Sequence, residues 1–321
     1  MFPDAAGIAI VGNLNVDQVV RTVTRFPEWD EELVVDAFHL ELAGTAGYLA
    51  AAARGLGMDP FVVSTIGDDT YGEFIRQELS AAGIDSSGIA TLPGMNTCLG
   101  IIFVGEHGER SILTVLGAHE QMSVEVARGH DAGIAGCAEV FLCGSYLLPE
   151  FRPGMLVDYA RDLRARGQTV VFDPSWDPEG WPDATQAETY ALLAEVDLFM
   201  PNDQELARLT RTQRWQDGVD ALAHTGCQVV VKRGADGAAA RLDGVDIDVP
   251  GLGIHAVNTI GAGDVFDVGF LYARRRGWEM ERCMEFAVAT ASYVIAQDGP
   301  RTYPDEETVR AFADGIRRGS R

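Results

Sequence analysis

Small residues and a carboxylate meet in one run of the sequence, Gly261-Ala262-Gly263-Asp264. The small residues let the backbone approach a ligand, and a helix is predicted to follow from about Asp264 to Arg276. Free amides at a helix start attract an anion such as phosphate. Asp264 would be repelled by that phosphate unless it takes a proton from an attacking hydroxyl. The alternative is that Asp264 only stabilises the helix N-terminus.

A second candidate site follows the predicted strand Gly7 to Gly12. Asn15 and Asp17 come just after this strand, at the edge where open α/β sheets bind ligands. An amide beside a carboxylate can both donate to and accept from vicinal hydroxyl groups, which suits a sugar. The alternative is an ordinary polar turn.

Together these two motifs resemble those of the PfkB, or ribokinase-like, family of carbohydrate and nucleoside kinases. The resemblance implies that Gly261, Ala262 and Gly263 form an anion hole, that Asp264 is the catalytic base, and that the substrate site includes Asn15 and Asp17. It also implies an α/β fold, a three-layer α/β/α sandwich with a mostly parallel central sheet and a small β-sheet lid. ATP and Mg²⁺ are the cofactors expected from the same resemblance.

The family's first signature has two glycines followed by a sugar-contacting Asn. Here Gly44 supplies one glycine, Ala43 replaces the other, and Tyr48 stands where the Asn is expected. A phenol donates one hydrogen bond and offers a face for stacking, but it is much larger than an amide. Gly44 and Tyr48 are therefore expected in the substrate site, and a simple ribose or fructose cannot be assumed.

Asn202 and Glu205 precede a predicted helix, so a capping turn would explain them. The resemblance instead implies that they orient water around Mg²⁺ and phosphate, in keeping with an ion that keeps its hydration shell. It further implies a nucleotide groove along Lys232, Gly234 and Gly299. Asn258 replaces a common Asp of the family's monovalent-cation site, which leaves dependence on such a cation open.

Four β segments are predicted to form the lid. Val16 to Val23 and Leu33 to Leu42 form one pair, and a hairpin joins Asn96 to Val104 with Arg110 to Val115. The lid would span residues 14–42 and 96–115, cover the substrate and, by resemblance, pair two subunits into a homodimer. Arg110 could reach a substrate anion or be a solvated hairpin charge.

From Glu139 onward, predicted strands and helices alternate, which implies parallel strands with crossover helices. Ser145 follows one of these strands and Asp173 another, so both are candidates for the ligand edge, Ser145 for substrate. No linker or repeat interrupts the chain, and residues 1–321 are predicted to form one kinase domain.

The formal charge of −23 argues against nucleic acid and anionic membranes as partners, because both are polyanions. The five cysteines form no Cys-x-x-Cys pair, and no apolar stretch reaches the length needed to span a bilayer, so a cytoplasmic location is expected. A Walker A loop is excluded, since the only lysine, Lys232, follows Val231 and precedes Arg233.

These observations predict an ATP-dependent kinase that phosphorylates a hydroxyl of a small sugar or sugar-like substrate. One alternative is a nucleoside kinase of the same fold, in which Tyr48 or Trp29 stacks on a base. Another is a sugar-binding regulator that kept the fold and lost turnover.

Overall fold

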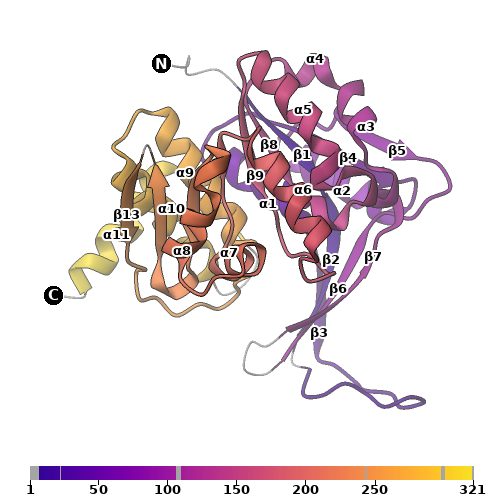
Figure 1. Ribbon diagram of the computed structural model, residues 1–321. Coiled ribbons are helices and arrows are strands. Elements are labelled where there is room, and N and C mark those ends of the chain that lie inside the picture. Colours follow the sequence, from indigo (N-terminus) through magenta and orange to yellow (C-terminus); the bar gives the residue numbers. More distant parts are fainter. Residues whose placement is uncertain (1–6, 22, 106–109, 243, 298–300, 320–321) are drawn as a thin grey trace.

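The structure is a computed structural model that describes residues 7–21, 23–105, 110–242, 244–297 and 301–319. Its central sheet has nine strands in the described residues, in the order β13-β12-β11-β10-β9-β8-β1-β4-β5. Among these strands only β12 runs against the others (Figure 1). The strands are β1 (Gly7–Gly12), β4 (Pro60–Gly67), β5 (Ile89–Leu92), β8 (Cys137–Cys143), β9 (Thr169–Asp173), β10 (Leu198–Phe199), β11 (Gln228–Lys232), β12 (Ala238–Leu242) and β13 (Val245–Val249).

Helices cover both faces of this sheet, which gives the three layers predicted from the sequence. One face packs against α1 (Gly44–Gly55), α2 (Thr70–Ala81), α9 (Ala262–Arg275) and α10 (Met280–Ile295), and α11 (Glu306–Gly319) packs on α10. The other face packs against α3 (Val124–Gly129), α4 (Asp131–Ile134), α5 (Pro153–Ala165), α6 (Asp183–Leu193), α7 (Asp203–Thr210) and α8 (Trp215–Leu222). Within the described residues, no helix combines the length and the apolar character needed to cross a membrane.

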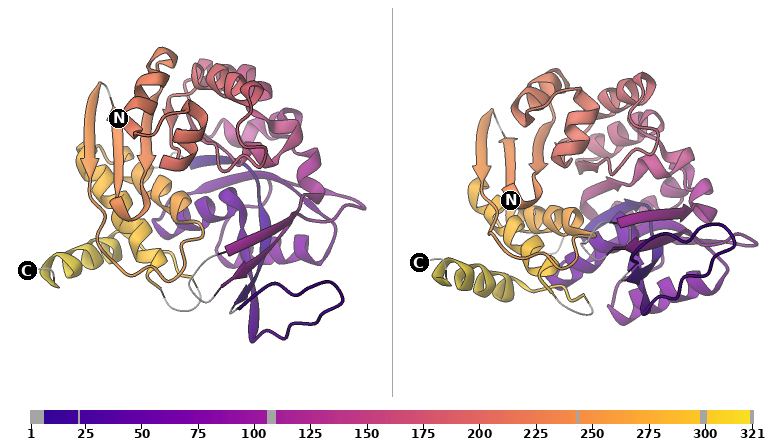
Figure 2. Two further views of the ribbon diagram at one scale, coloured as in Figure 1. Left: turned by 60° about the horizontal axis from the view of Figure 1, so that its bottom comes forward. Right: turned by 90° about the horizontal axis from the view of Figure 1, so that it is seen from below.

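A separate small sheet has the strand order β3-β2-β6-β7 and projects from one end of the central sheet (Figures 1 and 2). Its strands are β2 (Asn15–Arg21), β3 (Ala37–Ala43), β6 (Leu99–Val104) and β7 (Arg110–Val115). The register pairs Asp17 with both Glu41 and Gly100, so these three residues lie on one face. The four strands are those expected from the sequence, with the start of β3 four residues later.

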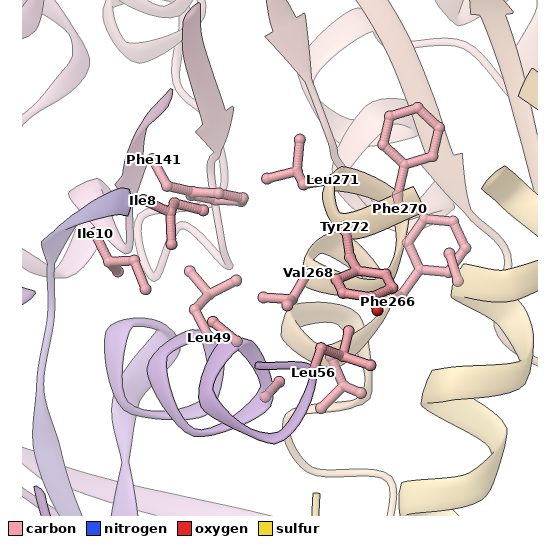
Figure 3. Close-up of a cluster of buried hydrophobic side chains, with 14 of the residues drawn as sticks. Ile8, Ile10, Leu49, Leu56, Phe141, Phe266, Val268, Phe270, Leu271 and Tyr272 are labelled. Atoms are coloured by element: carbon pink, nitrogen blue, oxygen red, sulfur yellow. The ribbon is translucent and has the colours of Figure 1, made fainter. Parts of the chain in front are cut away.

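The core beneath the candidate site is formed by α1 and α9, which pack on each other and on β1 and β8. Figure 3 shows Leu49 of α1 and Val268 of α9 facing each other, with Ile8, Ile10 and Phe141 of the sheet beside them. Gly55 lets α1 approach the C-terminal segment, because a Cβ there would lie 2.8 Å from Cβ of Tyr303. This packing holds the start of α9 against the residues that follow β1.

Candidate active site

Helix α9 begins at the predicted anion-binding run. Gly261 precedes the helix with a φ of 70°, a left-handed conformation that favours glycine, and no side chain caps the first amides. A Cβ on Gly261 would lie 2.8 Å from Cγ of Tyr48 and 3.0 Å from Nη1 of Arg301. The first amides of α9, including those of Ala262, Gly263 and Asp264, lack acceptors inside the helix and can bind an anion.

Asp264 lies in the first turn of α9 and is half-buried. Burial, followed by the charge of Asp173, raises the pKa of Asp264 to about 8, although Lys232 acts in the opposite direction. A carboxyl group with a pKa in this range can accept a proton near neutral pH and later release it. These properties suit a general base.

Lys232 is buried at the end of β11 and donates from Nζ to two carboxylates, at 2.8 Å to Asp173 Oδ2 and at 2.9 Å to Asp267 Oδ2. Burial alone would lower the pKa of Lys232, but Asp173 and Asp267 raise it above its usual range. The amine therefore remains charged. It also lies under the start of α9, where a Cβ on Gly263 would be 3.3 Å from Nζ.

Asn202 and Glu205 form a reciprocal cap on helix α7. The amide of Glu205 donates to Asn202 Oδ1 at 2.8 Å, and the amide of Asn202 donates to Glu205 Oε2 at 2.9 Å. The capping interpretation of these two residues is therefore correct as a local structure. Burial and the charge of Asp173 raise the pKa of Glu205 to about 7, so this end of the sheet carries more carboxylate charge than Lys232 balances.

The second predicted site gathers around Asp17. Asn15 Nδ2 donates to Asp17 Oδ1 at 2.7 Å. The hydroxyl of Tyr48 lies 3.2 Å from Asp17 Oδ2 and 3.1 Å from Glu41 Oε1, so its single hydrogen is shared between these two carboxylates. Gly44 is close as well, since a Cβ on it would lie 2.5 Å from Asn15 Oδ1. Burial, followed by the charge of Glu41, raises the pKa of Asp17 to about 7.

A family model described as "pfkB family carbohydrate kinase" matches residues 6–308 of the chain. The chain belongs to this family. It is 31% identical over 301 residues to an ATP-dependent ribose-1-phosphate kinase of Halopiger xanaduensis, covering 94% of this chain and 96% of the relative. It is 26% identical to a ribokinase of Haemophilus influenzae, covering 92% of this chain and 94% of that one.

Solved structures share the fold. Arabidopsis thaliana ribokinase, complexed with ribose and ATP, has a TM-score of 0.79 at 25% identity and covers 96% of this chain and 99% of its own. A putative ribokinase II of E. coli, in complex with ATP and Mg²⁺, has a TM-score of 0.82 at 21% identity, with coverages of 97% and 99%. The predicted family, the ribokinase-like fold and the kinase class are confirmed, and this chain is a sugar or nucleoside kinase.

Three residues of this PfkB kinase's site were missed in the sequence. Glu41 shares the hydroxyl hydrogen of Tyr48 with Asp17, and Gly100 leaves room for Asp17, because a Cβ there would lie 2.3 Å from Asp17 Oδ1. Arg301 places its guanidinium carbon 4.9 Å from the centre of the Tyr48 ring, so that this face of the phenol is covered. The one available signal for Arg301 was its position two residues after Gly299, which the resemblance assigns to the nucleotide groove.

The remaining predicted residues divide into three groups. Ser145 is buried in a short 3₁₀ turn, and its Oγ has no hydrogen-bond partner among the described residues. Gly234 opens the turn after β11 with a φ of 55° and has free space around its Cα. Gly299 lies outside the described residues, and so does the side chain of Arg110, although the backbone of Arg110 pairs with Val104 in the small sheet.

Proposed function

We propose that this kinase transfers the γ-phosphoryl group of ATP to a hydroxyl of a small sugar or sugar-like acceptor, with Asp264 as general base. The observation that carries the proposal is the position of Asp264, whose pKa is raised to about 8, in the first turn of a helix with uncapped amides. Tyr48 links the two parts of the site, because its ring lies against Gly261 at that helix start and its hydroxyl lies within hydrogen-bond distance of Asp17 and Glu41. A proton acceptor, an anion hole and a hydroxyl-binding cluster thus adjoin one another.

The residues would then act in sequence. Asn15, Asp17 and Tyr48 orient the acceptor, and Asp264 takes the proton from the hydroxyl that attacks the phosphoryl group in line. The amides of Ala262, Gly263 and Asp264 donate to the phosphoryl oxygens as negative charge develops on them. The proton leaves Asp264 once the phosphorylated product and ADP have formed.

Magnesium fits this site as a hydrated ion. The described residues contain no group of three or more His, Cys, Asp or Glu side chains arranged to hold a bare metal. The charge of Asp173 raises the pKa of both Glu205 and Asp264, however, and the charge of Glu205 also raises that of Asp264; such an excess of negative charge favours a cation. Mg²⁺ would neutralise the nucleotide phosphates, and Asn202 and Glu205 would hold it through water.

The nucleotide is proposed to lie along the turn after β11. Gly234, whose surroundings are open, would let the backbone approach ATP, and Gly299 is assigned to the same groove. Lys232 receives a different role from the one predicted, because both of its hydrogen bonds go to buried carboxylates. We assign it to positioning the start of α9.

The acceptor is proposed to contain a ribose-like ring. The relatives include a ribose-1-phosphate kinase, ribokinases, a deoxyribokinase and a nucleoside kinase. The substrates in these names have such a ring in common. Cover of the Tyr48 ring by Arg301 argues against the alternative in which Tyr48 stacks on a nucleoside base.

The chain is proposed to act as one domain whose small sheet, residues 14–42 and 96–115, closes over the acceptor as a lid. The lid is also proposed to join two subunits. The register places Phe38, Leu113 and Val115 on the face opposite Asp17, and these side chains are exposed. Neighbouring exposed apolar residues of this kind mark interaction surfaces.

The decisive experiment measures Mg²⁺-dependent release of ADP from ATP with a panel of sugars, sugar phosphates, polyols and nucleosides. Asp264→Asn should lower turnover about 100-fold or more while leaving the melting temperature near that of the wild type or above it. Glu281→Gln is the control, since it removes an exposed first-turn carboxylate from helix α10. Wild-type turnover by Asp264→Asn with an active acceptor would overturn the proposed base.

A further inference from the structure

Arg301 has donors that the protein does not use. Its side chain is only 10% exposed, and within the described residues neither Nη1 nor Nη2 has a hydrogen-bond partner. The nearest carboxylate oxygen, Glu41 Oε1, is 3.9 Å from Nη2, which is too far for a hydrogen bond. A buried guanidinium whose two terminal nitrogens lack hydrogen bonds is unfavourable even with the phenol of Tyr303 nearby, so this one is expected to gain a partner in a functional state.

Arg301 lies in the reaction site, so the acceptor that its guanidinium gains is expected to be a ligand bound there. The guanidinium lies over the Tyr48 ring, and Nη1 would be 3.0 Å from a Cβ on Gly261. Its charge lowers the pKa of both Asp17 and Asp264, although burial dominates at each carboxyl group. Arg301 is therefore close to the hydroxyl-binding cluster and to the start of α9.

The two cations of the site differ in what they can offer a ligand. Lys232 is held by two carboxylates at hydrogen-bond distance beneath Gly263. Arg301 contacts residues of the acceptor site, Tyr48 and Glu41, and adjoins Gly261 instead of Gly263. A planar guanidinium with two free terminal nitrogens matches the oxygens of a phosphate, which can accept two parallel hydrogen bonds.

We propose that the acceptor is itself a sugar phosphate ester and that Arg301 binds its phosphate group. This inference rests on the proposed function and specifies its substrate class. Arg301 lies on the side of Gly261 that faces Tyr48 and Glu41. The phosphate that it binds therefore belongs to the acceptor and is not the phosphoryl group being transferred. The ester oxygens take the hydrogen bonds that the protein leaves unmade, and they replace the long contact with Glu41.

The test compares ribose, ribose 1-phosphate and ribose 5-phosphate as acceptors for the wild-type kinase and for Arg301→Met. The quantity measured is the ratio of kcat/KM for a phosphate ester to kcat/KM for ribose. The wild type should prefer one of the esters, and Arg301→Met should lower that preference about 100-fold or more. Arg282→Met is the matched control, because Arg282 also lies over an aromatic ring, at 4.7 Å from that of Trp278, on helix α10.

Other results would overturn the inference. A wild type that prefers free ribose, or a preference unchanged in Arg301→Met, shows that Arg301 does not select an ester. An equal loss of kcat/KM with ribose and with the esters would indicate that Arg301 binds the transferred phosphoryl group instead. If Arg301→Met fails to fold, Arg301→Lys is measured instead, and it should lose part of the ester preference since a lysine lacks the planar fork.

Failure of the proposed function would look different. In that case no acceptor would support ADP release that depends on Asp264. Turnover of ribose that Asp264→Asn abolishes, with no preference for an ester, would contradict only the assignment of Arg301. A binding measurement gives a further readout, because Asp264→Asn should bind the preferred ester without ATP about 100-fold more tightly than Asp264→Asn/Arg301→Met.

Discussion

Lys232 Nζ donates to Asp267 Oδ2 at 2.9 Å, and this bond ties the end of strand β11 to helix α9 one turn after Asp264. The same amine donates to Asp173 at the end of β9. Three elements that are far apart in the sequence thus meet beneath the anion-binding helix start. The cation fixes this start and moderates the pKa of Asp264.

Replacing Lys232 with Met should destabilise the protein by about 3–5 kcal/mol, since two buried carboxylates would lose their common partner. Chemical denaturation with intrinsic tryptophan fluorescence measures this loss. Arg161→Met is the control: the half-exposed Arg161 pairs with the exposed Asp158 and the partly exposed Glu195, and pairs of this kind at the surface contribute about 1 kcal/mol or less. Equal losses in the two variants would contradict a stabilising role for Lys232. Adding Asp267→Asn to Lys232→Met should restore part of the stability.

The stability of the free protein should depend on pH through Asp264. Its pKa is raised from 3.8 in the unfolded chain to about 8 in the folded protein, so the folded state binds more protons between these values. The contribution of this group is therefore fully favourable below about pH 4 and is lost as the pH rises toward 8. Asp264→Asn removes this loss. Its free energy of unfolding relative to wild type should increase by about 1 kcal/mol or more from pH 4 to pH 8.

Urea titrations of both proteins at several pH values measure that difference. Asp305→Asn is a suitable control, because the exposed Asp305 accepts hydrogen bonds from Thr308 that lower its pKa, which gives the opposite slope. A difference between Asp264→Asn and wild type that stays constant with pH would contradict the raised pKa.

Gly261→Ala should impair the site beyond the cost of its backbone conformation. A left-handed φ costs an alanine about 1–2 kcal/mol, and the new Cβ would also press on Tyr48 and Arg301. Gly277 follows the same helix with a φ of 69°, against 70° at Gly261, but has no atom within 4 Å of a built Cβ. We expect kcat/KM to fall about 100-fold in Gly261→Ala and to stay near wild type in Gly277→Ala. Equal kcat/KM values in both variants would show that the reaction does not depend on the exact position of the start of α9.

Disruption of the outer face of the lid should yield monomers. Phe38→Glu/Leu113→Glu places charges on two exposed side chains of β3 and β7, and sedimentation velocity should then report half the wild-type mass. Met155→Glu changes an apolar residue on helix α5 that is also about half exposed, and it should leave the mass unchanged. A wild-type protein that is already monomeric at high concentration would refute the proposed dimer.

Local sequence patterns were sufficient for most elements of the fold. Glycine and apolar periodicity predict α9, a helix from Met280 to Ala296 that corresponds to α10, and the hairpin of β6 and β7, each within a few residues of its observed bounds. The Ala-rich run predicts a helix from Leu49 to Gly55, but α1 begins at Gly44, because burial of Thr45 and Gly47 compensates for their weak helix propensity. The apolar run Val196 to Met200 predicts a strand, but β10 is limited to Leu198–Phe199, although the amide of Met200 still donates to the carbonyl of Phe172 on β9.

The site was predictable only where its residues are neighbours in the sequence. The run ending in Asp264 and the pair Asn15 and Asp17 are such local motifs. The partners of Lys232 are 59 and 35 residues away, and Arg301 reaches Tyr48 only after the chain has folded. No spacing rule connects these positions, since the contacts depend on which strand ends share an edge of the sheet.

Because the chain has a single lysine and that lysine is buried between two carboxylates, the surface of the described residues offers no lysine amine for reaction. Amine-directed dyes and crosslinkers should therefore modify the folded protein at its N-terminus alone. Labelling of Lys232 would report unfolding, which makes amine reactivity a direct probe of the integrity of the α9 start.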